Sequence, residues 1–289
     1  MDAPPDGIHN INNALRRHET FVYAVWTAFH PAQYETRFEL FASLTLENFA
    51  KAWVQAPFAR FFLNTTILVV MILTAQVVLA TFAAYAFAVY DFPGKNIVFG
   101  LILMQLMIMP DILLVENYTT MRQLGLVDTI VAIGLPYMGA AFAIFLLRRT
   151  FMTIPKELNE AARIESANAV TLLWRVYVPL AKPTYLAFGL VSVSARWNDF
   201  IWPLIVTNSV ETRPLTVGLS IFAATDSDVE WSVINAATLM TAGPLQALRD
   251  WIFEHERAIE IQDFAAPETL TGDTCAPCGA TTGGANGAT

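Results

Sequence analysis

The stretch NTTILVVMILTAQVVLATFAAYAFAVY, residues 64–90, contains no charged side chain. The hydrocarbon core of a bilayer is about 30 Å thick and needs about 20 apolar residues in a helix to cross it. This stretch is longer than that requirement. The composition of the whole chain supports a membrane location. Of its 289 residues, 55% are hydrophobic and only 15% are charged, which is far from the balance of soluble domains. The sequence therefore predicts a membrane protein.

Other apolar runs predict further spans on both sides of this stretch. The turn DFPGKN ends the first span, because proline and glycine interrupt helices. Later spans are expected at residues 97–115, 128–147 and 184–206, and a fifth begins near Trp231 but soon meets Arg249 and Asp250. Ahead of Asn64 the run TFVYAVWTAF gives about half a span. We expect an all-α, polytopic membrane helix bundle of about five to six spans.

Three segments follow from this division. Residues 1–63 form an N-terminal segment with an incomplete first span, which a cleavable signal peptide explains poorly because no A-x-A-like site follows. Residues 64–248 form the membrane core, and residues 249–289 form an atypical tail, rich at its end in glycine, alanine and threonine, that we expect to be disordered. The abrupt change after Pro244 favours a frame-shifted or foreign continuation of the chain. In that case the protein would not be functional.

Cationic side chains orient the bundle, since loops on the cytoplasmic side are enriched in lysine and arginine. The loop at about 149–183 and its edge hold six of them, at Arg148, Arg149, Lys156, Arg163, Arg175 and Lys182. The loops at 117–126 and 207–230 carry only Arg122 and Arg213. We therefore expect the loop at 149–183 to be cytoplasmic.

This cytoplasmic loop contains NEAARIESANAVTLLWRVYVPLAKP, residues 159–183. Pro155 suits a first helical turn, and small alanines then recur at helical spacing beside Glu160. A second short helix is expected from about Val170 to Tyr177, ending before Pro179. An amphipathic helix lying on the membrane surface would show the same periodicity.

The same residues resemble the EAA loop of the inner-membrane permease subunits of binding-protein-dependent ABC importers. Its Glu-Ala-Ala, small-residue and proline positions fall on Glu160, Ala161, Ala162, Ala167 and Pro179. LTLENFAKAW before the first full span and WNDFIWPLIVTNSVETRPLTVGL after the loop resemble the carbohydrate-uptake branch of that family. The resemblance runs from roughly Leu44 to Pro244. Glu165 and Ser166 stand where the family usually has Asp-Gly.

The resemblance implies a permease subunit in a bacterial or archaeal plasma membrane. It would pair with a second permease, two cytoplasmic ATPase subunits and an extracytoplasmic solute-binding protein, and carry a sugar or sugar-like polyol, including glycerol phosphates. Docking to the ATPase would use Glu160, Ala161, Ala162, Ser166, Ala167 and Pro179. The chain would be no enzyme and need no cofactor, and it contains no G-x-x-x-x-G-K-[ST] loop.

Polar residues interrupt the fourth span at Arg196, Trp197, Asn198 and Asp199. A charged side chain at the bilayer centre costs about 2.5 to 3.5 kcal/mol on insertion scales, so these residues should face the bundle interior. Arg196 and Asp199 are three residues apart and can pair on one helix face. Either the Arg196–Asp199 pair simply neutralises itself, or these four residues line the translocation path, where the polar Asn198 and the aromatic face of Trp197 suit a sugar.

The sequence contains few other motifs for metal binding or catalysis. Cys275 and Cys278 form a lone C-x-x-C without a second ligand pair, and the four histidines lack any metal-binding spacing. Two other classes of protein stay open on the residues alone. An integral membrane enzyme would have to build its site on Arg196 and Asp199, and a passive channel would not need the cytoplasmic loop.

Overall fold

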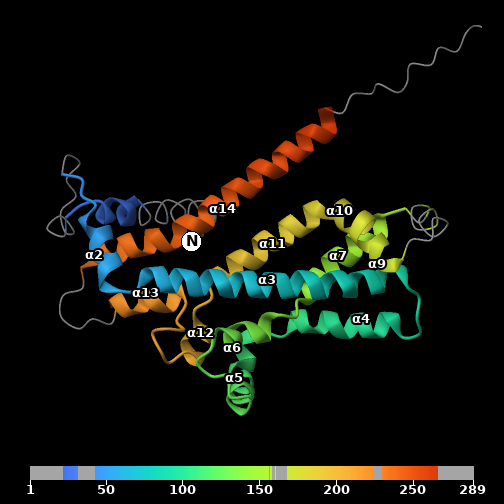
Figure 1. The fold of residues 1–289 in the computed structure, drawn as a ribbon, viewed down its shortest axis with the longest axis horizontal. Helices are drawn as coiled ribbons and strands as arrows, with labels where there is room; N and C mark the ends of the chain where they lie inside the picture. Colours follow the sequence, from blue (N-terminus) through green and yellow to red (C-terminus); the bar gives the residue numbers. More distant parts are fainter. Residues whose placement is uncertain are drawn as a thin grey trace, which may run out of the picture. The chain divides into compact units, whose positions relative to one another are not determined.

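A computed structural model describes residues 22–31, 43–155, 157, 160, 168–223 and 230–265. The uncharged stretch forms most of α3 (Phe58–Val89), which lies against α7, α11, α6 and α13 (Figure 1). Every regular element in these ranges is helical, which confirms the all-α expectation. The chain divides into Met1–Ile252 and Phe253–Thr289, and the packing described below belongs to the first unit.

The described elements are helices of very different lengths, from three residues in η2 to 35 in α14. They are α2 (Glu47–Gln55), α3, α4 (Lys95–Met104), η2 (Gln105–Met107), η3 (Pro110–Leu113), α5 (Leu114–Gln123), α6 (Ile130–Gly134), η4 (Leu135–Tyr137), α7 (Ala141–Thr153), α9 (Ala169–Leu172), η5 (Leu173–Tyr177), α10 (Val178–Leu180), α11 (Lys182–Trp197), α12 (Ile201–Val206), α13 (Leu215–Ala223) and α14 (Trp231–Ala265).

By length and apolar composition, α3 is the one described helix that could cross a membrane unbroken. Three further pairs pass the same test only as bent units, with breaks of 90° between Lys95–Met107 and Pro110–Gln123, 48° between Ile130–Tyr137 and Ala141–Thr153, and 75° between Ala169–Leu180 and Lys182–Trp197. This gives up to four spans among the described residues. The first break falls at Pro110, which begins η3, where its missing N–H needs no partner.

The expectation of a continuous fourth span over 184–206 is wrong. The helix α11 ends at Trp197 and α12 begins at Ile201. The Asn198 side chain donates to the carbonyl of Ser194 at 2.8 Å, and an asparagine side chain that bonds its own backbone competes with helix continuation. The polar residues of this region therefore lie at a helix break.

Three clusters of buried side chains surround α3 at different heights. Phe61 and Val69 belong to a cluster with Val193, Trp197 and residues of α14. Leu68 and Ile72 pack with α6 and α12, and Ala80, Ala84 and Tyr85 pack with α7 and η5. At Gly218 of α13 a Cβ would overlap the Phe61 ring, so only glycine allows this close approach.

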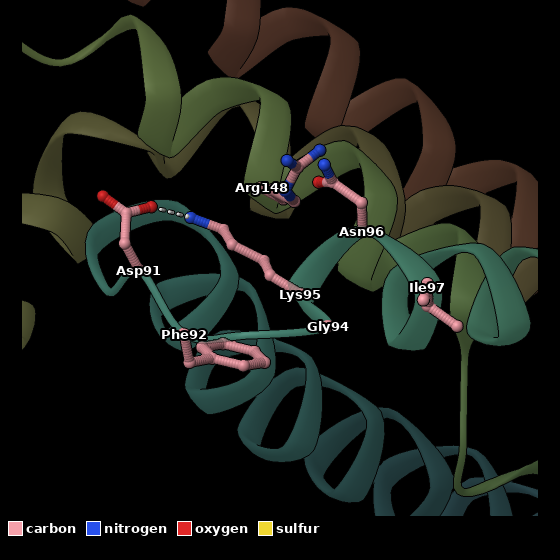
Figure 2. A pocket seen from close by; sticks show the side chains of 7 residues that line it. All are labelled: Asp91, Phe92, Gly94, Lys95, Asn96, Ile97 and Arg148. Carbon is pink, nitrogen blue, oxygen red and sulfur yellow. Dashed lines mark hydrogen bonds and ion pairs between the residues drawn. The ribbon is translucent and has the colours of Figure 1, made fainter.

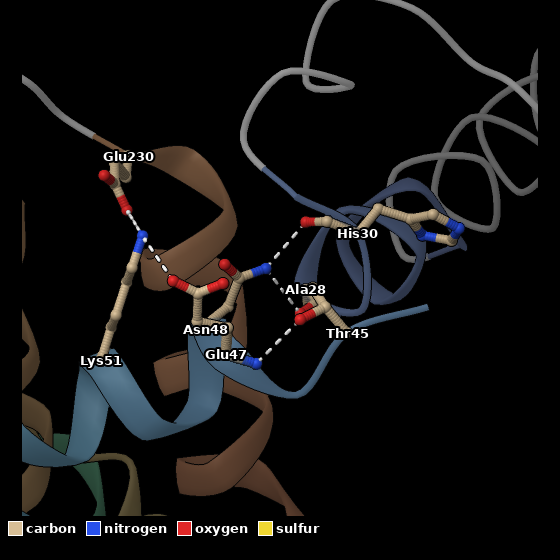
Figure 3. Close-up of polar contacts among 7 residues, drawn as sticks. All are labelled: Ala28, His30, Thr45, Glu47, Asn48, Lys51 and Glu230. Carbon is tan, nitrogen blue, oxygen red and sulfur yellow. Dashed lines mark hydrogen bonds and ion pairs between the residues drawn. The ribbon is translucent and has the colours of Figure 1, made fainter. Parts of the chain in front are cut away.

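Polar contacts join the first described segment to α2, and α2 to Glu230 directly ahead of α14 (Figure 3). Residues 22–28 are helical, and the buried Asn48 amide donates to the carbonyls of Ala28 at 3.0 Å and His30 at 2.8 Å. Lys51 bridges Glu47 at 3.6 Å and Glu230 at 3.4 Å. The apolar run ahead of Asn64 thus packs against the core through α2.

The C-terminal region begins with α14, which is not among the described helices long and apolar enough to cross a membrane. It continues helically past Pro244 to Ala265. Residues 266–289, which include Cys275 and Cys278, lie outside the described residues. The disordered tail and its frame-shifted origin stay predictions.

Candidate functional site

The expected docking loop begins after α7, and much of it lies outside the described residues. Ala161, Ala162, Ser166 and Ala167 are in that part. Glu160 is described and exposed. The structure therefore places the acidic residue of the motif at the surface and leaves its alanine positions as predictions.

The second half of the loop is a continuous helical segment, α9, η5 and α10, with η5 a π-helix. The expectation that it ends before Pro179 is wrong, because the segment runs to Leu180. Pro179 lies in the last turn of this segment, directly after the π-helix η5. A proline there has no N–H to bond the preceding turn.

Aromatic side chains fasten this segment to the membrane helices. The Tyr177 ring is 4% exposed and meets the edges of Tyr85 on α3 and Phe151 on α7, with centroids 5.2 Å and 5.3 Å apart. Leu172 and Leu173 are buried beside it. The packing role of Tyr177 was not predicted from the sequence, although an aromatic residue two positions before Pro179 was a visible signal.

A polar cluster lies at the middle of the bundle, where the fourth span breaks. Arg196 donates to Asp199 at 3.2 Å, and the two side chains are 21% and 17% exposed. The predicted pairing is therefore confirmed. The Arg196 guanidinium also lies 3.8 Å from the ring centroid of Tyr137, which adds a cation–π attraction to the ion pair.

Residues that the sequence did not single out extend this cluster to α3 and α13. Gln76 of α3 donates to the carbonyl of Tyr137 at 2.7 Å and accepts from the Ser192 hydroxyl of α11. Thr216 of α13 donates to the carbonyl of Asp199 at 2.7 Å. A polar glutamine within an apolar span is a signal for such a contact, because it needs a buried partner.

Trp197 and Asn198 do not share one role in the structure. The Trp197 indole is 8% exposed and donates to the carbonyl of Thr241 at 3.0 Å. Its ring packs against Phe62, so it holds α11 to α14 and offers little free face to a solute. Asn198 is exposed. The structure therefore shows Trp197 as a packing residue, and the translocation path through Arg196, Trp197, Asn198 and Asp199 stays a prediction.

Near the end of the bundle opposite the docking loop, Asp128 ties two loops together. It precedes α6, with φ of 65°, and accepts hydrogen bonds from the Thr212 hydroxyl and from the backbone amides of Asn208 and Ser209. Burial tends to raise the pKa of Asp128, but these hydrogen bonds outweigh it and hold the pKa well below its ordinary range.

No group of three or more histidine, cysteine, aspartate or glutamate side chains that could hold a metal occurs within the described ranges. The polar cluster itself contains one cation and one carboxylate, already paired. It can offer hydrogen bonds to a polar solute, and its contacts link four elements, α3, η4, α11 and α13.

Comparison with known proteins identifies the kind of chain this is. Residues 42–253 match the family described as binding-protein-dependent transport system inner membrane component. The chain is 30% identical over 189 residues to the sn-glycerol-3-phosphate transport system permease protein UgpE of Yersinia pestis, covering 65% of this chain and 67% of the relative. It is 32% identical over 208 residues to the arabinooligosaccharides transport system permease protein AraQ of Halalkalibacterium halodurans, covering 72% and 74%.

Solved structures share the fold. A chain from the crystal structure of a bacterial ABC transporter involved in the import of the acidic polysaccharide alginate superposes with a TM-score of 0.73 at 22% identity, covering 88% of this chain and 98% of that one. A chain from the alginate transporter in complex with alginate pentasaccharide-bound periplasmic protein gives a TM-score of 0.60 at 14% identity, covering 87% and 94%.

Proposed function

The chain belongs to the family of binding-protein-dependent transport system inner membrane components, and we propose that it forms half of the translocation path of an importer for a sugar or sugar-like solute. A component of this family is a non-catalytic membrane subunit, and ATP is hydrolysed by a partner subunit.

The observation that carries the coupling proposal is the packing of Tyr177 between α3 and α7. In this proposal a force on the docking loop enters the described structure at α9, reaches Tyr177 through η5, and passes from Tyr177 to Tyr85. From Tyr85 to Gln76 the helix α3 spans about 13 Å, at about 1.5 Å per residue. Gln76 in turn is bonded to the polar cluster. From α9 to the polar cluster these contacts support a loop that moves the path when an ATPase pulls on it.

The expected partners are a second permease, two cytoplasmic ATPase subunits and an extracytoplasmic solute-binding protein, with lipid around the spans and no nucleic acid. The cationic loop supports a cytoplasmic orientation for Glu160. A periplasmic binding protein accompanies the solved alginate transporter. Exposed apolar side chains on α4 and η2, among them Leu101 at 61% and Met107 at 84%, offer surface to lipid or to the second permease.

The solute class follows from the relatives, whose names specify sn-glycerol-3-phosphate and arabinooligosaccharides. Both are rich in hydroxyl groups. Hydroxyl-rich solutes need hydrogen-bonding groups along their path, and Asn198, Asp199 and Arg196 supply them here. The specific solute is set mainly by the binding protein in our proposal.

Uptake by the reconstituted complex tests the proposal. Glu160→Lys should place like charge against a basic ATPase surface, and nucleotide-dependent uptake should fall by about tenfold or more while the chain still inserts in the membrane. Glu116→Lys makes the same charge change on exposed α5 and should leave uptake near the parental rate. Normal uptake by Glu160→Lys would remove the coupling role from this segment.

The same assay distinguishes an ATP-driven importer from a passive channel. A passive channel would carry solute without nucleotide and would be indifferent to both substitutions. A cysteine reporter at Ser166 should also react only from the cytoplasm, and one at Ser209 only from outside; the opposite pattern would invert the proposed orientation.

A further inference from the structure

A pocket of about 510 Å³ lies between the turn that follows α3 and the helix α7 (Figure 2). Its lining residues are Asp91, Phe92, Gly94, Lys95, Asn96, Ile97 and Arg148. Gly94 takes φ of 82° and lets the chain turn directly into α4. The pocket therefore lies where the uncharged stretch of α3 ends, at the expected level of the membrane surface.

Two cations in the pocket are held in place by backbone carbonyls. The Lys95 ammonium donates to the carbonyl of Tyr90 at 2.8 Å and to Asp91 at 3.0 Å. The Arg148 Nε donates to the carbonyl of Phe87 at 3.3 Å, and its guanidinium lies 4.2 Å from the Phe99 ring centroid. These contacts fix both charges before any ligand arrives, which lowers the entropy cost of binding.

The charge of the pocket is only partly balanced. Asp91 pairs with Lys95, and its side chain is 98% exposed. Within the described part of the chain, no acidic side chain lies within ion-pair distance of Arg148. Because Nε is the atom that bonds Phe87, the two Nη groups remain to bind an anion, and a guanidinium binds phosphate oxygens with two parallel hydrogen bonds.

An apolar stripe leads away from these charges along α4. Ile97, Leu101 and Met104 lie on one helix face, at spacings of four and three residues, and are 72%, 61% and 56% exposed. Tyr90, 45% exposed at the end of α3, suits the interface between headgroups and acyl chains. A free anion would need only the two cations, whereas a phospholipid would use both the cations and the stripe.

We infer that this pocket binds the phosphodiester headgroup of an acidic phospholipid, with the acyl chains along Ile97, Leu101 and Met104. The ligand chemistry is a phosphate group, and its source is the cytoplasmic leaflet, where acidic lipids attract basic residues. The leaflet follows from the proposed orientation of the chain, but the pocket chemistry does not depend on transport. A bound lipid would brace the α3–α4 turn against α7, because Lys95 and Arg148 come from the two sides.

The experiment measures the thermal unfolding midpoint of the full chain in mild detergent, titrated with phosphatidylglycerol, phosphatidylcholine or inorganic phosphate. Phosphatidylglycerol should raise the midpoint in a saturable way, and the other two should not. Arg148→Gln should weaken the apparent affinity by about tenfold or more, since it removes a charged hydrogen-bond donor pair. Arg149→Gln is the matched control, because Arg149 neighbours Arg148 in sequence, does not line the pocket and lies over Phe145 instead.

Arg148→Gln also removes the contacts of Arg148 with Phe99 and Phe87. A second variant therefore tests the pocket while Arg148 is kept. Asn96 is exposed, so Asn96→Trp should fill the pocket and reduce the phosphatidylglycerol effect while Arg148 stays in place. Equal shifts with phosphatidylcholine would overturn recognition of an acidic headgroup. Equal shifts with inorganic phosphate would overturn the lipid in favour of a small anion, and unchanged affinity in both Arg148→Gln and Asn96→Trp would overturn the site. None of these readouts involves uptake, so failure here is distinct from failure of the proposed function.

Discussion

The two halves of α3 differ in what they add to the apolar packing that both share. In the first half, called here the hydrogen-bonded half, Asn64 donates to the carbonyls of Glu211 and Arg213 and Thr65 accepts from the amide of Leu215. In the second half, called here the packed half, Ala80, Ala84 and Tyr85 lie close against α7 and η5. Hydrogen bonds to a loop set one position, whereas apolar packing against small residues tolerates more than one arrangement. The packed half is the one that meets the proposed docking loop.

The largest expected effect is on the packed half. Tyr177→Ala should lower the free energy of unfolding by about 4 kcal/mol, because it removes a buried ring between Tyr85 and Phe151. Tyr177→Phe keeps the ring and should stay within about 1 kcal/mol of the parent. Denaturant unfolding in mixed micelles measures both variants. If the alanine variant were as stable as the phenylalanine variant, this half of α3 would not depend on the contact.

The next effect lies where the two halves meet, at the polar cluster. Asp199→Asn should cost about 3 kcal/mol of unfolding free energy, because it leaves the Arg196 charge unpaired in a largely buried place. Asp91→Asn breaks the Lys95 pair, whose aspartate is 98% exposed, and should cost less than about 1 kcal/mol. Replacing both Arg196 and Asp199 by leucine should restore most of the stability. Similar losses for Asp199→Asn and Asp91→Asn would show that the cluster is as exposed as the surface pair.

A smaller loss of unfolding free energy is expected from a substitution in the hydrogen-bonded half. Asn64→Leu leaves the carbonyls of Glu211 and Arg213 without their donor, at a cost of about 2 kcal/mol. Thr66→Ala is the matched control, since the exposed Thr66 hydroxyl bonds only the carbonyl of Phe62 one turn before it; its loss should be within about 0.5 kcal/mol. The unfolding midpoints of the two variants decide whether the loop at 207–214 depends on Asn64.

The smallest effect concerns the pH dependence of that same loop. Because the folded-state pKa of Asp128 is lowered, its contribution is present above the ordinary aspartate pKa of about 4 and is lost as pH falls further. Asp128→Asn should lose less than about 1 kcal/mol at neutral pH, since the site is largely solvated. The difference from the parent should be constant between about pH 8 and pH 5 and should shrink below about pH 4. A difference that grew on acidification would reverse the assigned direction.

The sequence predicted the helical class and the family, since long apolar runs and the motif around Glu160 are local signals. The Arg196–Asp199 pair was also predictable, because a spacing of three residues places two side chains on one helix face. The break at Asn198 was missed because hydropathy averages over it. The role of Trp197 was missed because its acceptor, the carbonyl of Thr241, belongs to another helix.

What the sequence alone determined is therefore the set of apolar segments, their cationic loop and the pairing of near neighbours. Only the tertiary structure decided which side of each segment is buried. On α3, Ile72 is fully buried and Val70 is 57% exposed, yet both are β-branched aliphatic residues in the same turn. In a membrane helix lipid satisfies an apolar side chain as well as protein does, so hydropathy carries no record of which face packs. Packing against α6 and α12 makes that choice for Ile72.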